Sequence, residues 1–244
     1  EHISIINVHP ICVSSIFLPI SYVLLIPFLI AKKKCSIIFN LSDLPILTFK
    51  KQIMLFDWPY GLYPNDYAWT LMNNRDLLKR KVKLFFVKIL FRFVDIIVVQ
   101  NSVMKKRLIE NYNFHNVHII HNATSLDNLA PKNNKRLYSF NRKINLLYLT
   151  YYYTHKNLEI FIPLAKKIIK KNLDYGIVTT ISKNQGIEAE DFLKKVESEN
   201  LSSVINNIGP VSMEDVPNLY METDGLLMPT LLETFSGTYV EAMY

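Results

Sequence analysis

Residues 229–244 read PTLLETFSGTYVEAMY, and this stretch is the most informative part of the sequence. It follows a short apolar run, residues 225–228, which Pro229 prevents from continuing as a central strand. Small and hydroxylated residues then predict a loop and a helix N-cap over residues 230–237, and residues 238–243 have the character of a first helical turn. The free N–H groups and positive dipole end of such a helix favour phosphate.

Two glutamates flank the Phe-Ser-Gly turn of this stretch. Glu241 falls near the first turn of the predicted helix, where a carboxylate is suited to accept both hydroxyls of a ribose. Glu233 precedes the turn and lies nearer to a sugar attached to the phosphates. Cleaving a glycosyl-phosphate bond develops positive charge on the sugar and negative charge on the diphosphate, so these residue types suit that chemistry. By spacing alone, two unrelated surface glutamates remain the other interpretation.

The pattern PTLLETFSGTYVEA at residues 229–242 resembles the Glu-x7-Glu signature of the family 4 (group 1) glycosyltransferases. The usual form of that signature is Pro-Ser-x-x-Glu-Gly-Phe-Gly-x-x-x-x-Glu-Ala. Both glutamates, Phe235 and Ala242 match it, while Thr234 and Ser236 stand where the family usually has glycines. The resemblance implies the GT-B fold, an α/β architecture of two Rossmann-like domains that face a cleft. Both domains are expected to be incomplete here, in a fragment truncated at both ends.

The second half of the chain follows the family's order of segments. Residues 144–149 (INLLYL) predict a buried strand, and a helix is expected at about residues 158–171. Family members commonly carry an Arg at this strand end and a Lys five residues later, and both clamp the donor diphosphate. Lys156 matches the Lys, Tyr151 stands in the Arg position, and His155 is a candidate to compensate. Without the resemblance, Lys156 is equally well an ordinary lysine at a helix start.

Alternation continues towards residue 229. Residues 175–181 predict a second strand, residues 213–221 a short helix and residues 223–228 the strand that leads into the site. The turn NIGPV at residues 207–211 resembles the one whose backbone flanks the nucleobase in the family. This order of elements argues for a parallel sheet, with ligands beyond the carboxyl ends of its strands.

The resemblance also implies the roles of the site residues. Glu233 is the catalytic candidate, which contacts the transferred sugar, and Glu241 holds the ribose. The other candidates for binding the donor are Lys156, His155, Val211, Phe235, Ser236, Gly237 and Thr238. The implied reaction retains the anomeric configuration, uses a nucleotide diphosphate-sugar and needs neither a cofactor nor a bound metal. The acceptor is a glycan or a lipid-linked molecule, in cell-surface polysaccharide synthesis.

The first half of the chain alternates in the same way and is expected to form the acceptor domain. The predicted elements are strands at residues 36–40, 52–56, 96–99 and 117–121, and helices at residues 75–94 and 102–112. Asp57 and Trp58 follow the second of these strands, so we expect them at the acceptor side of the cleft; an ordinary turn before Pro59 is the alternative. The predicted domains are residues 1–130 and 144–244, joined by a polar linker at residues 131–143.

Composition and charge bound the function further. Half of the residues are hydrophobic, and the two cysteines, Cys12 and Cys35, favour a reducing compartment without a disulfide framework. Residues 1–130 contain 15 Lys and Arg against 8 Asp and Glu, whereas residues 131–244 contain 13 of each. The sequence lacks a nucleic-acid reader motif, so no nucleic-acid partner is expected.

Two segments of the basic half suggest a membrane surface. Residues 75–94 mix seven cations with apolar residues, as a basic amphipathic helix does, or as a core helix with a solvated basic face. Residues 11–31 form an uncharged run of 21 residues, broken by Pro19 and Pro27, that ends against three lysines. A bilayer span, shallow membrane contact and a buried helix are its three interpretations. The expected location is cytoplasmic, at the inner face of the cell membrane.

Two other functions stay open at this stage. The chain is also consistent with a non-catalytic, membrane-associated partner that kept the fold, because Tyr151 replaces the Arg and two glycines are absent. A nucleotide-sugar epimerase of the same fold is the third hypothesis. The sequence does not identify the sugar, the base or the acceptor.

Overall fold

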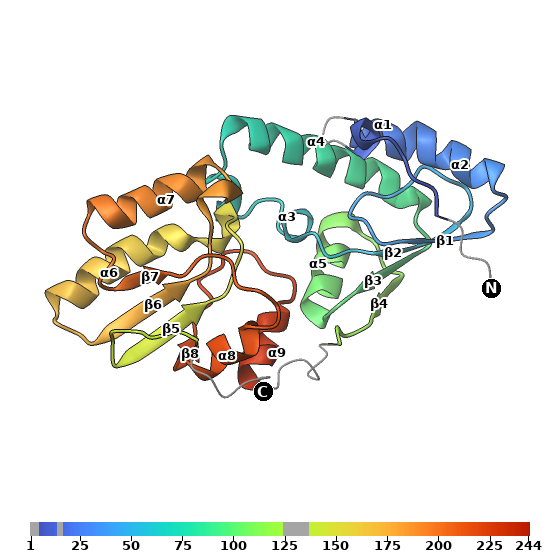
Figure 1. The fold of residues 1–244 in the computed structure, drawn as a ribbon. Helices are drawn as coiled ribbons and strands as arrows, with labels where there is room; N and C mark the ends of the chain where they lie inside the picture. The colour runs from blue at the N-terminus through green and yellow to red at the C-terminus, as the bar shows by residue number, and fades with distance from the viewer. Residues whose placement is uncertain (1–4, 14–16, 124–136) are drawn as a thin grey trace. The chain divides into compact units, whose positions relative to one another are not determined.

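A computed structural model describes residues 5–13, 17–123 and 137–244 (Figure 1). The chain forms two compact units, Glu1–Asn122 and Ala123–Tyr244, and each is built on a parallel four-stranded sheet. The predicted α/β fold with two Rossmann-like domains is therefore confirmed. The predicted linker, residues 131–143, lies partly outside the described residues.

The sheet of unit 1 has its strands in sequence order. They are β1 (Ile37–Asn40), β2 (Lys51–Leu55), β3 (Ile96–Val99) and β4 (Val117–Ile119). These are the strands that the apolar runs predict, with their ends moved by at most two residues. The central strand β3 is the most buried, because Ile97, Val98 and Val99 are all covered, as expected when both faces of a parallel sheet are packed.

The two longest helices of unit 1 begin at side-chain caps that the sequence contains. The helices are α1 (Leu18–Ile20), α2 (Ile26–Lys32), α3 (Pro59–Leu62), α4 (Asn74–Leu90) and α5 (Ser102–Tyr112). The Asn73 side chain accepts from the Asp76 N–H at 2.9 Å, and Asn101 accepts from Met104 at the same distance, so both α4 and α5 start at an N-cap asparagine. The predicted helix at residues 75–94 ends as a 3-10 turn, Phe91–Phe93.

The apolar run at residues 11–31 folds around its second proline. A π-helical turn, Ser21–Leu25, connects α1 to α2. Pro27 has no N–H for the carbonyl of Val23, and a wider turn before it accommodates the loss. The segment is only partly buried: Pro19 and Ser21 are covered, whereas no residue of α2 is buried and Phe28 is 62% exposed. Among the described helices, none has the length and apolar content needed to cross a membrane.

The sheet of unit 2 reverses its strand order. The strands are β5 (Ile144–Tyr148), β6 (Tyr175–Thr179), β7 (Ile205–Asn207) and β8 (Gly225–Leu226), in the spatial order β7-β6-β5-β8. The helices are α6 (Phe161–Lys170), α7 (Ile187–Ser198), α8 (Val216–Met221) and α9 (Gly237–Met243). A 3-10 turn, Thr154–Lys156, follows β5. The sequence patterns predict neither α7 nor β7.

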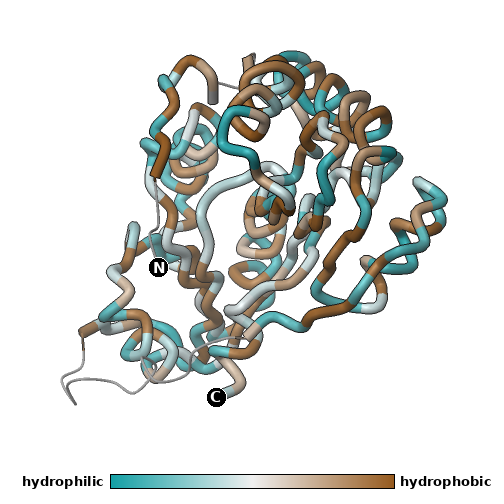
Figure 2. The backbone as a smooth tube through the Cα atoms, turned by 90° about the vertical axis from the view of Figure 1, so that its right-hand side faces the viewer, coloured by the Kyte–Doolittle hydropathy of each residue, from teal (hydrophilic) through white to brown (hydrophobic). Residues whose placement is uncertain are grey.

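Helices α6 and α7 close one face of this sheet. Ala189, Phe192 and Val196 of α7 recur at intervals of three and four, so they lie on one helix side and are buried. They join a core that includes Phe161 of α6, whose ring meets the Tyr148 ring edge-on at 5.6 Å. In the hydropathy colouring of Figure 2, helices of the chain alternate between apolar and polar residues along their length.

A smaller cluster forms around Leu147, Val178 and Leu219. Tyr138 packs against this cluster, and the Glu222 carboxylate accepts hydrogen bonds from the N–H groups of Leu137 and Tyr138, both at 2.6 Å. The described part of the predicted linker therefore belongs to unit 2.

Candidate functional site

The reversal of strand order in unit 2 creates the place for a site. From β5 the chain proceeds to β6 and then β7 on one side, and it returns to β8 on the other side of β5. The loops that leave β5 and β8 therefore diverge beyond the carboxyl ends of these strands. A crevice at such a switch point is where open α/β sheets bind ligands. The two loops are residues 149–157 and 227–236.

Hydrogen bonds join these two loops. The His155 carbonyl accepts from the Leu231 N–H at 2.8 Å and from the Thr230 hydroxyl at 3.2 Å. Asn157, which has a left-handed backbone (φ 57°), donates from its side chain to the Pro229 carbonyl at 3.1 Å. Asparagine tolerates this backbone region better than most residues. The turn after β5 is thereby fixed against the loop after β8.

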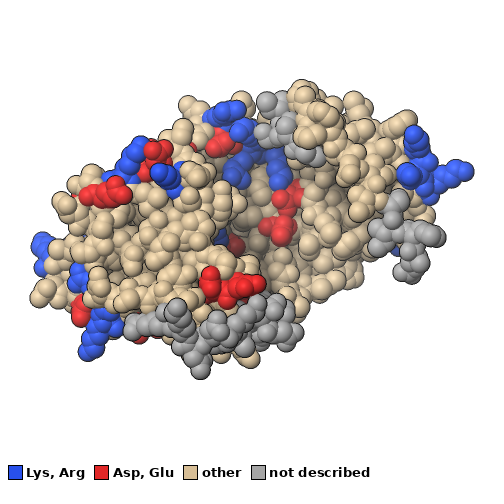
Figure 3. Space-filling view, viewed as in Figure 1, with Lys and Arg blue, Asp and Glu red and all other residues tan. Residues whose placement is uncertain are grey.

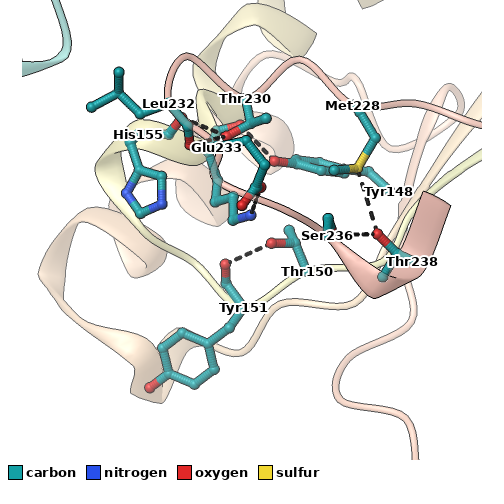
Figure 4. Close-up of polar contacts among 11 residues, drawn as sticks. Tyr148, Thr150, Tyr151, His155, Met228, Thr230, Leu232, Glu233, Ser236 and Thr238 are labelled. Atoms are coloured by element: carbon teal, nitrogen blue, oxygen red, sulfur yellow. Dashed lines mark hydrogen bonds and ion pairs between the residues drawn. The ribbon is translucent and has the colours of Figure 1, made fainter. Parts of the chain in front are cut away.

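An ion pair connects the two loops at their polar side. Lys156 Nζ lies 2.7 Å from Glu233 Oε2, and the two side chains are only 16% and 24% exposed. Figure 4 shows Glu233 reaching from its loop towards the turn that carries His155. Partly buried pairs are screened less by water and salt than exposed ones. The structure thus brings the predicted catalytic carboxylate and the predicted phosphate cation into direct contact.

Glu241 is held by a residue that the sequence analysis missed. The Tyr220 hydroxyl of α8 donates to Glu241 Oε2 at 2.8 Å. Burial, followed by this carboxylate, raises the pKa of Tyr220, so the hydroxyl keeps its proton and remains a donor. Since α9 begins at Gly237, Glu241 lies in the second helical turn, whereas the sequence predicted the first.

The Phe-Ser-Gly turn differs in detail from its prediction. Ser236 is the N-cap residue of α9, but its side chain makes no cap hydrogen bond. Its hydroxyl lies instead 2.7 Å from that of Thr238 (Figure 4). The backbone at Ser236 has φ −119°, a value open to any residue, so this position does not require the glycine of the family signature. Phe235, just before it, is partly buried.

An aromatic row occupies the region where the family carries its Arg. Tyr151 is 50% exposed, and its ring centre lies 5.1 Å from that of Tyr153. The Tyr153 ring in turn stacks on His155, with 5.6 Å between centres and 19° between planes. Val211 lies elsewhere in unit 2 and packs against the Leu147 cluster. It follows a turn at Gly209, which has a left-handed backbone (φ 77°).

Asp57 of unit 1 belongs to a charged cluster. Partial burial of its carboxyl, a hydrogen bond with Asp43 and the Asp43 charge raise the pKa of Asp57 to about 6, while the Lys83 charge acts in the opposite direction. Lys83 Nζ lies 3.0 Å from Asp43 Oδ2 and 4.3 Å from the centre of the Trp58 ring. Trp58 is only 5% exposed, so it packs inside unit 1 and does not offer an open face to a sugar.

The remaining members of these clusters carry different sequence signals. The proximity of Asp43 to Asp57 could have been predicted from the sequence. Asp43 follows β1 as Asp57 follows β2, and neighbouring parallel strands end at the same edge of a sheet. Tyr220 and Lys83 lie on helices, and nothing in their local sequence indicates their partners.

Comparisons with known proteins place this fold. No family profile matches the chain. A curated relative, the "Uncharacterized 41.2 kDa protein in cps region" of Klebsiella pneumoniae, is 24% identical over 188 residues, which is 75% of this chain and 49% of that protein. The chain thus spans about half the length of this relative.

Three solved structures share the fold at low sequence identity. Sucrose-phosphate synthase from Thermosynechococcus elongatus has a TM-score of 0.66, with 14% identity and coverage of 88% of this chain and 55% of that one. A glycosyltransferase from Rickettsia africae has a TM-score of 0.60 at 17% identity, and the match covers 97% of this chain and 62% of that one. Anabaena HepE, solved in complex with UDP and glucose, has a TM-score of 0.56 at 13% identity, and the match covers 87% of this chain and 58% of that one. At these identities the likeness is one of fold.

Proposed function

We propose that this chain is part of a retaining glycosyltransferase, which moves a sugar from a nucleotide diphosphate-sugar to a glycan or lipid-linked acceptor. The observation that carries the proposal is the Lys156–Glu233 ion pair at the switch point between β5 and β8. It sets one cation and one carboxylate side by side in the kind of crevice that binds nucleotides in α/β sheets. The shared fold with a protein solved with UDP and glucose supports this function.

In this proposal the two members of the pair serve opposite charges of one reaction. The Lys156 ammonium binds the donor diphosphate, together with backbone N–H groups of Phe235, Ser236, Gly237 and Thr238. When the Lys156 ammonium pairs with the diphosphate, its ion pair with Glu233 breaks. The Glu233 carboxylate then faces the sugar and stabilises the positive charge that develops there. The bond from the sugar to the diphosphate oxygen breaks, the acceptor oxygen bonds to the same carbon, and the acceptor proton leaves with the diphosphate.

Glu241 is proposed to bind the ribose, with Tyr220 as its positioning residue. A carboxylate accepts both hydroxyls of a cis-diol, and the 2.8 Å hydrogen bond from Tyr220 orients it for this purpose. His155 and Val211 complete the proposed donor site at the sugar and base ends. The cationic role belongs to Lys156 rather than to a metal ion, so EDTA should leave turnover unchanged.

The acceptor and the cellular setting are further parts of the proposal. Asp57, whose pKa is raised to about 6 by partial burial and by Asp43, is proposed to accept a hydrogen bond from the acceptor hydroxyl. The name of the Klebsiella relative refers to a cps region, which supports cell-surface polysaccharide synthesis. We place the protein in the cytoplasm, at the inner face of the cell membrane.

The first test is the binding of UDP, GDP, ADP and dTDP to the intact protein by calorimetry. One nucleotide should bind saturably. Glu241→Ala should weaken that binding by about tenfold or more, and Tyr220→Phe by about fivefold, the value of one hydrogen bond. Binding that neither substitution changes would contradict the ribose assignment.

Turnover tests the catalytic carboxylate with a matched pair of glutamates. Glu233 and Glu190 each pair with a lysine, at 2.7 and 2.8 Å, but the Glu190–Lys194 pair is exposed on α7. Glu233→Gln should lower kcat by about a hundredfold or more, and Glu190→Gln should not change it. Equal kcat values in both variants would contradict the assignment of Glu233 as the catalytic carboxylate.

A non-catalytic partner protein is the second candidate, favoured by Tyr151 in the position of the family's Arg. It predicts nucleotide binding without donor hydrolysis or transfer. Donor turnover with a retained anomer excludes this alternative, and a free epimer as product would instead identify an epimerase.

A further inference from the structure

The outward face of α4 is apolar. Leu78, Val82, Phe85 and Ile89 recur at intervals of four, three and four, which places them on one helix face. They are 64%, 40%, 59% and 38% exposed, whereas the buried residues of α4 are Val87 and Leu90. A surface helix ordinarily turns polar residues to this side. The exposed side of this helix is therefore apolar as well as basic.

A second exposed stripe runs along α1 and α2. Phe17, Ile20, Leu24 and Phe28 follow at intervals of three, four and four, and they are 43%, 51%, 65% and 62% exposed. Figure 1 shows this helical segment beside α4. An apolar hollow of about 360 Å³ joins the two, and the residues that line it are Leu18, Pro19, Leu44, Leu78, Lys79, Arg80, Val82 and Lys83. The two stripes and this hollow are called the outer patch below.

Cations accompany the outer patch. Lys81 and Lys88 lie exposed beside the α4 stripe, and within the described part of the chain neither forms an ion pair. Lys79, Arg80 and Lys83 border the hollow, but Lys79 already pairs with Asp76 at 3.1 Å and Lys83 with Asp43 at 3.0 Å. Three more lysines, residues 32–34, close the end of α2, and Figure 3 shows Lys and Arg gathered there beside a largely uncharged surface over α1 and α2. Apolar side chains thus lie among basic ones on one side of unit 1.

We propose that the outer patch docks unit 1 onto an anionic bilayer, lying in the interface without crossing it. Apolar side chains enter the boundary between headgroups and acyl chains, and the lysines face lipid phosphates. A second copy of the chain fits less well, because self-pairing would set the exposed lysines of one copy against those of the other. The inference concerns unit 1 and does not depend on the proposed donor site in unit 2.

The test is sedimentation of the intact protein with vesicles of phosphatidylcholine, with and without phosphatidylglycerol. We expect binding to the anionic vesicles only, and weaker binding as salt rises. The paired substitutions Leu78→Gln and Phe85→Gln should lower binding about tenfold or more. Lys81→Gln and Lys88→Gln should each lower it about fivefold.

The control substitutions lie on α5 of the same unit. Val103 is an exposed apolar residue and Lys106 an exposed lysine, so Val103→Gln and Lys106→Gln should bind as the unaltered protein does. The proposal is overturned if no vesicle binds, if phosphatidylcholine alone binds equally, or if the patch and control variants behave alike. A dimer that the patch variants abolish, in a protein that binds no vesicle, would assign the surface to a second copy.

Discussion

Helices α4 and α7 are both amphipathic, yet they use their two sides in opposite ways. Helix α7 buries Phe192 at 3% exposure and keeps its charges outside, where Glu190 and Lys194 pair at 2.8 Å. Helix α4 leaves Phe85 59% exposed, with the exposed Lys81 and Lys88 beside it. The apolar residues of α7 stabilise the fold, whereas half of those on α4 contribute little to it. Amphipathicity in the sequence therefore does not reveal which side of a helix faces the core.

Stability measurements provide the largest test of this contrast. Phe192→Ala should lower the free energy of unfolding by about 3–5 kcal/mol, because it opens a cavity in the core of unit 2. Phe85→Ala should change it by no more than about 0.5 kcal/mol, as expected for an exposed position. Urea unfolding of both variants measures the difference. A loss of several kcal/mol for Phe85→Ala would show that α4 packs its stripe against another part of the protein.

Two ion pairs differ in exposure in a similar way. Lys194 on α7 is 63% exposed, while Lys156 at the switch point is 16% exposed and faces Glu233. Lys156→Gln should weaken nucleotide diphosphate binding by about 1.5–3 kcal/mol, the usual value of a charge-assisted hydrogen bond. Lys194→Gln should leave it unchanged. Calorimetry of both variants measures their affinity for the nucleotide diphosphate. Equal affinities would show that Lys156 does not bind the diphosphate.

The smallest effect concerns the carboxyl pair of unit 1. Partial burial and Asp43 raise the pKa of Asp57 to about 6 in the folded protein, above the ordinary pKa of 3.8 for this side chain. The folded state therefore holds this proton more tightly, and stability should fall as the pH rises through about 6. In Asp57→Asn this part of the pH dependence disappears. Melting temperatures at pH 5 and pH 7.5 measure it, and the expected change is below about 1 kcal/mol because solvent screens the group.

Asp191→Asn on α7 serves as the control for this pH dependence, because Asp191 is exposed. It should keep the pH dependence of the unaltered protein. Identical curves for all three proteins would mean that the Asp43–Asp57 contact does not persist in solution.

Most elements were predictable because their signals are local. Buried strands such as Ile96–Val99 are continuous apolar runs, and α4 and α5 start at asparagine caps. Helix α7 escaped prediction because its N-cap is Gly186, which offers no side-chain acceptor and has a φ of 136°. The cap signal that marks other helices is absent from its sequence.

The candidate site was predictable only in part. The resemblance indicated Lys156 and Glu233 as separate residues, but their contact depends on a strand order that places β8 beside β5. The Tyr220–Glu241 hydrogen bond depends in the same way on the tertiary structure, because its two residues lie on different helices, α8 and α9. The burial of Trp58 depends on packing within unit 1, and it is not encoded in the immediate neighbours of this residue.

The double hydrogen bond at the His155 carbonyl has a consequence for folding. Thr230 and His155 are 75 residues apart in the chain, so their contact closes a long loop and requires both β5 and β8 to be in place. The neighbouring N–H of Leu231 donates to the same carbonyl. Its hydrogen is protected from exchange with heavy water only while the two loops stay joined. The exchange rate of this single amide thus reports when the loops after β5 and β8 join, before any ligand is added.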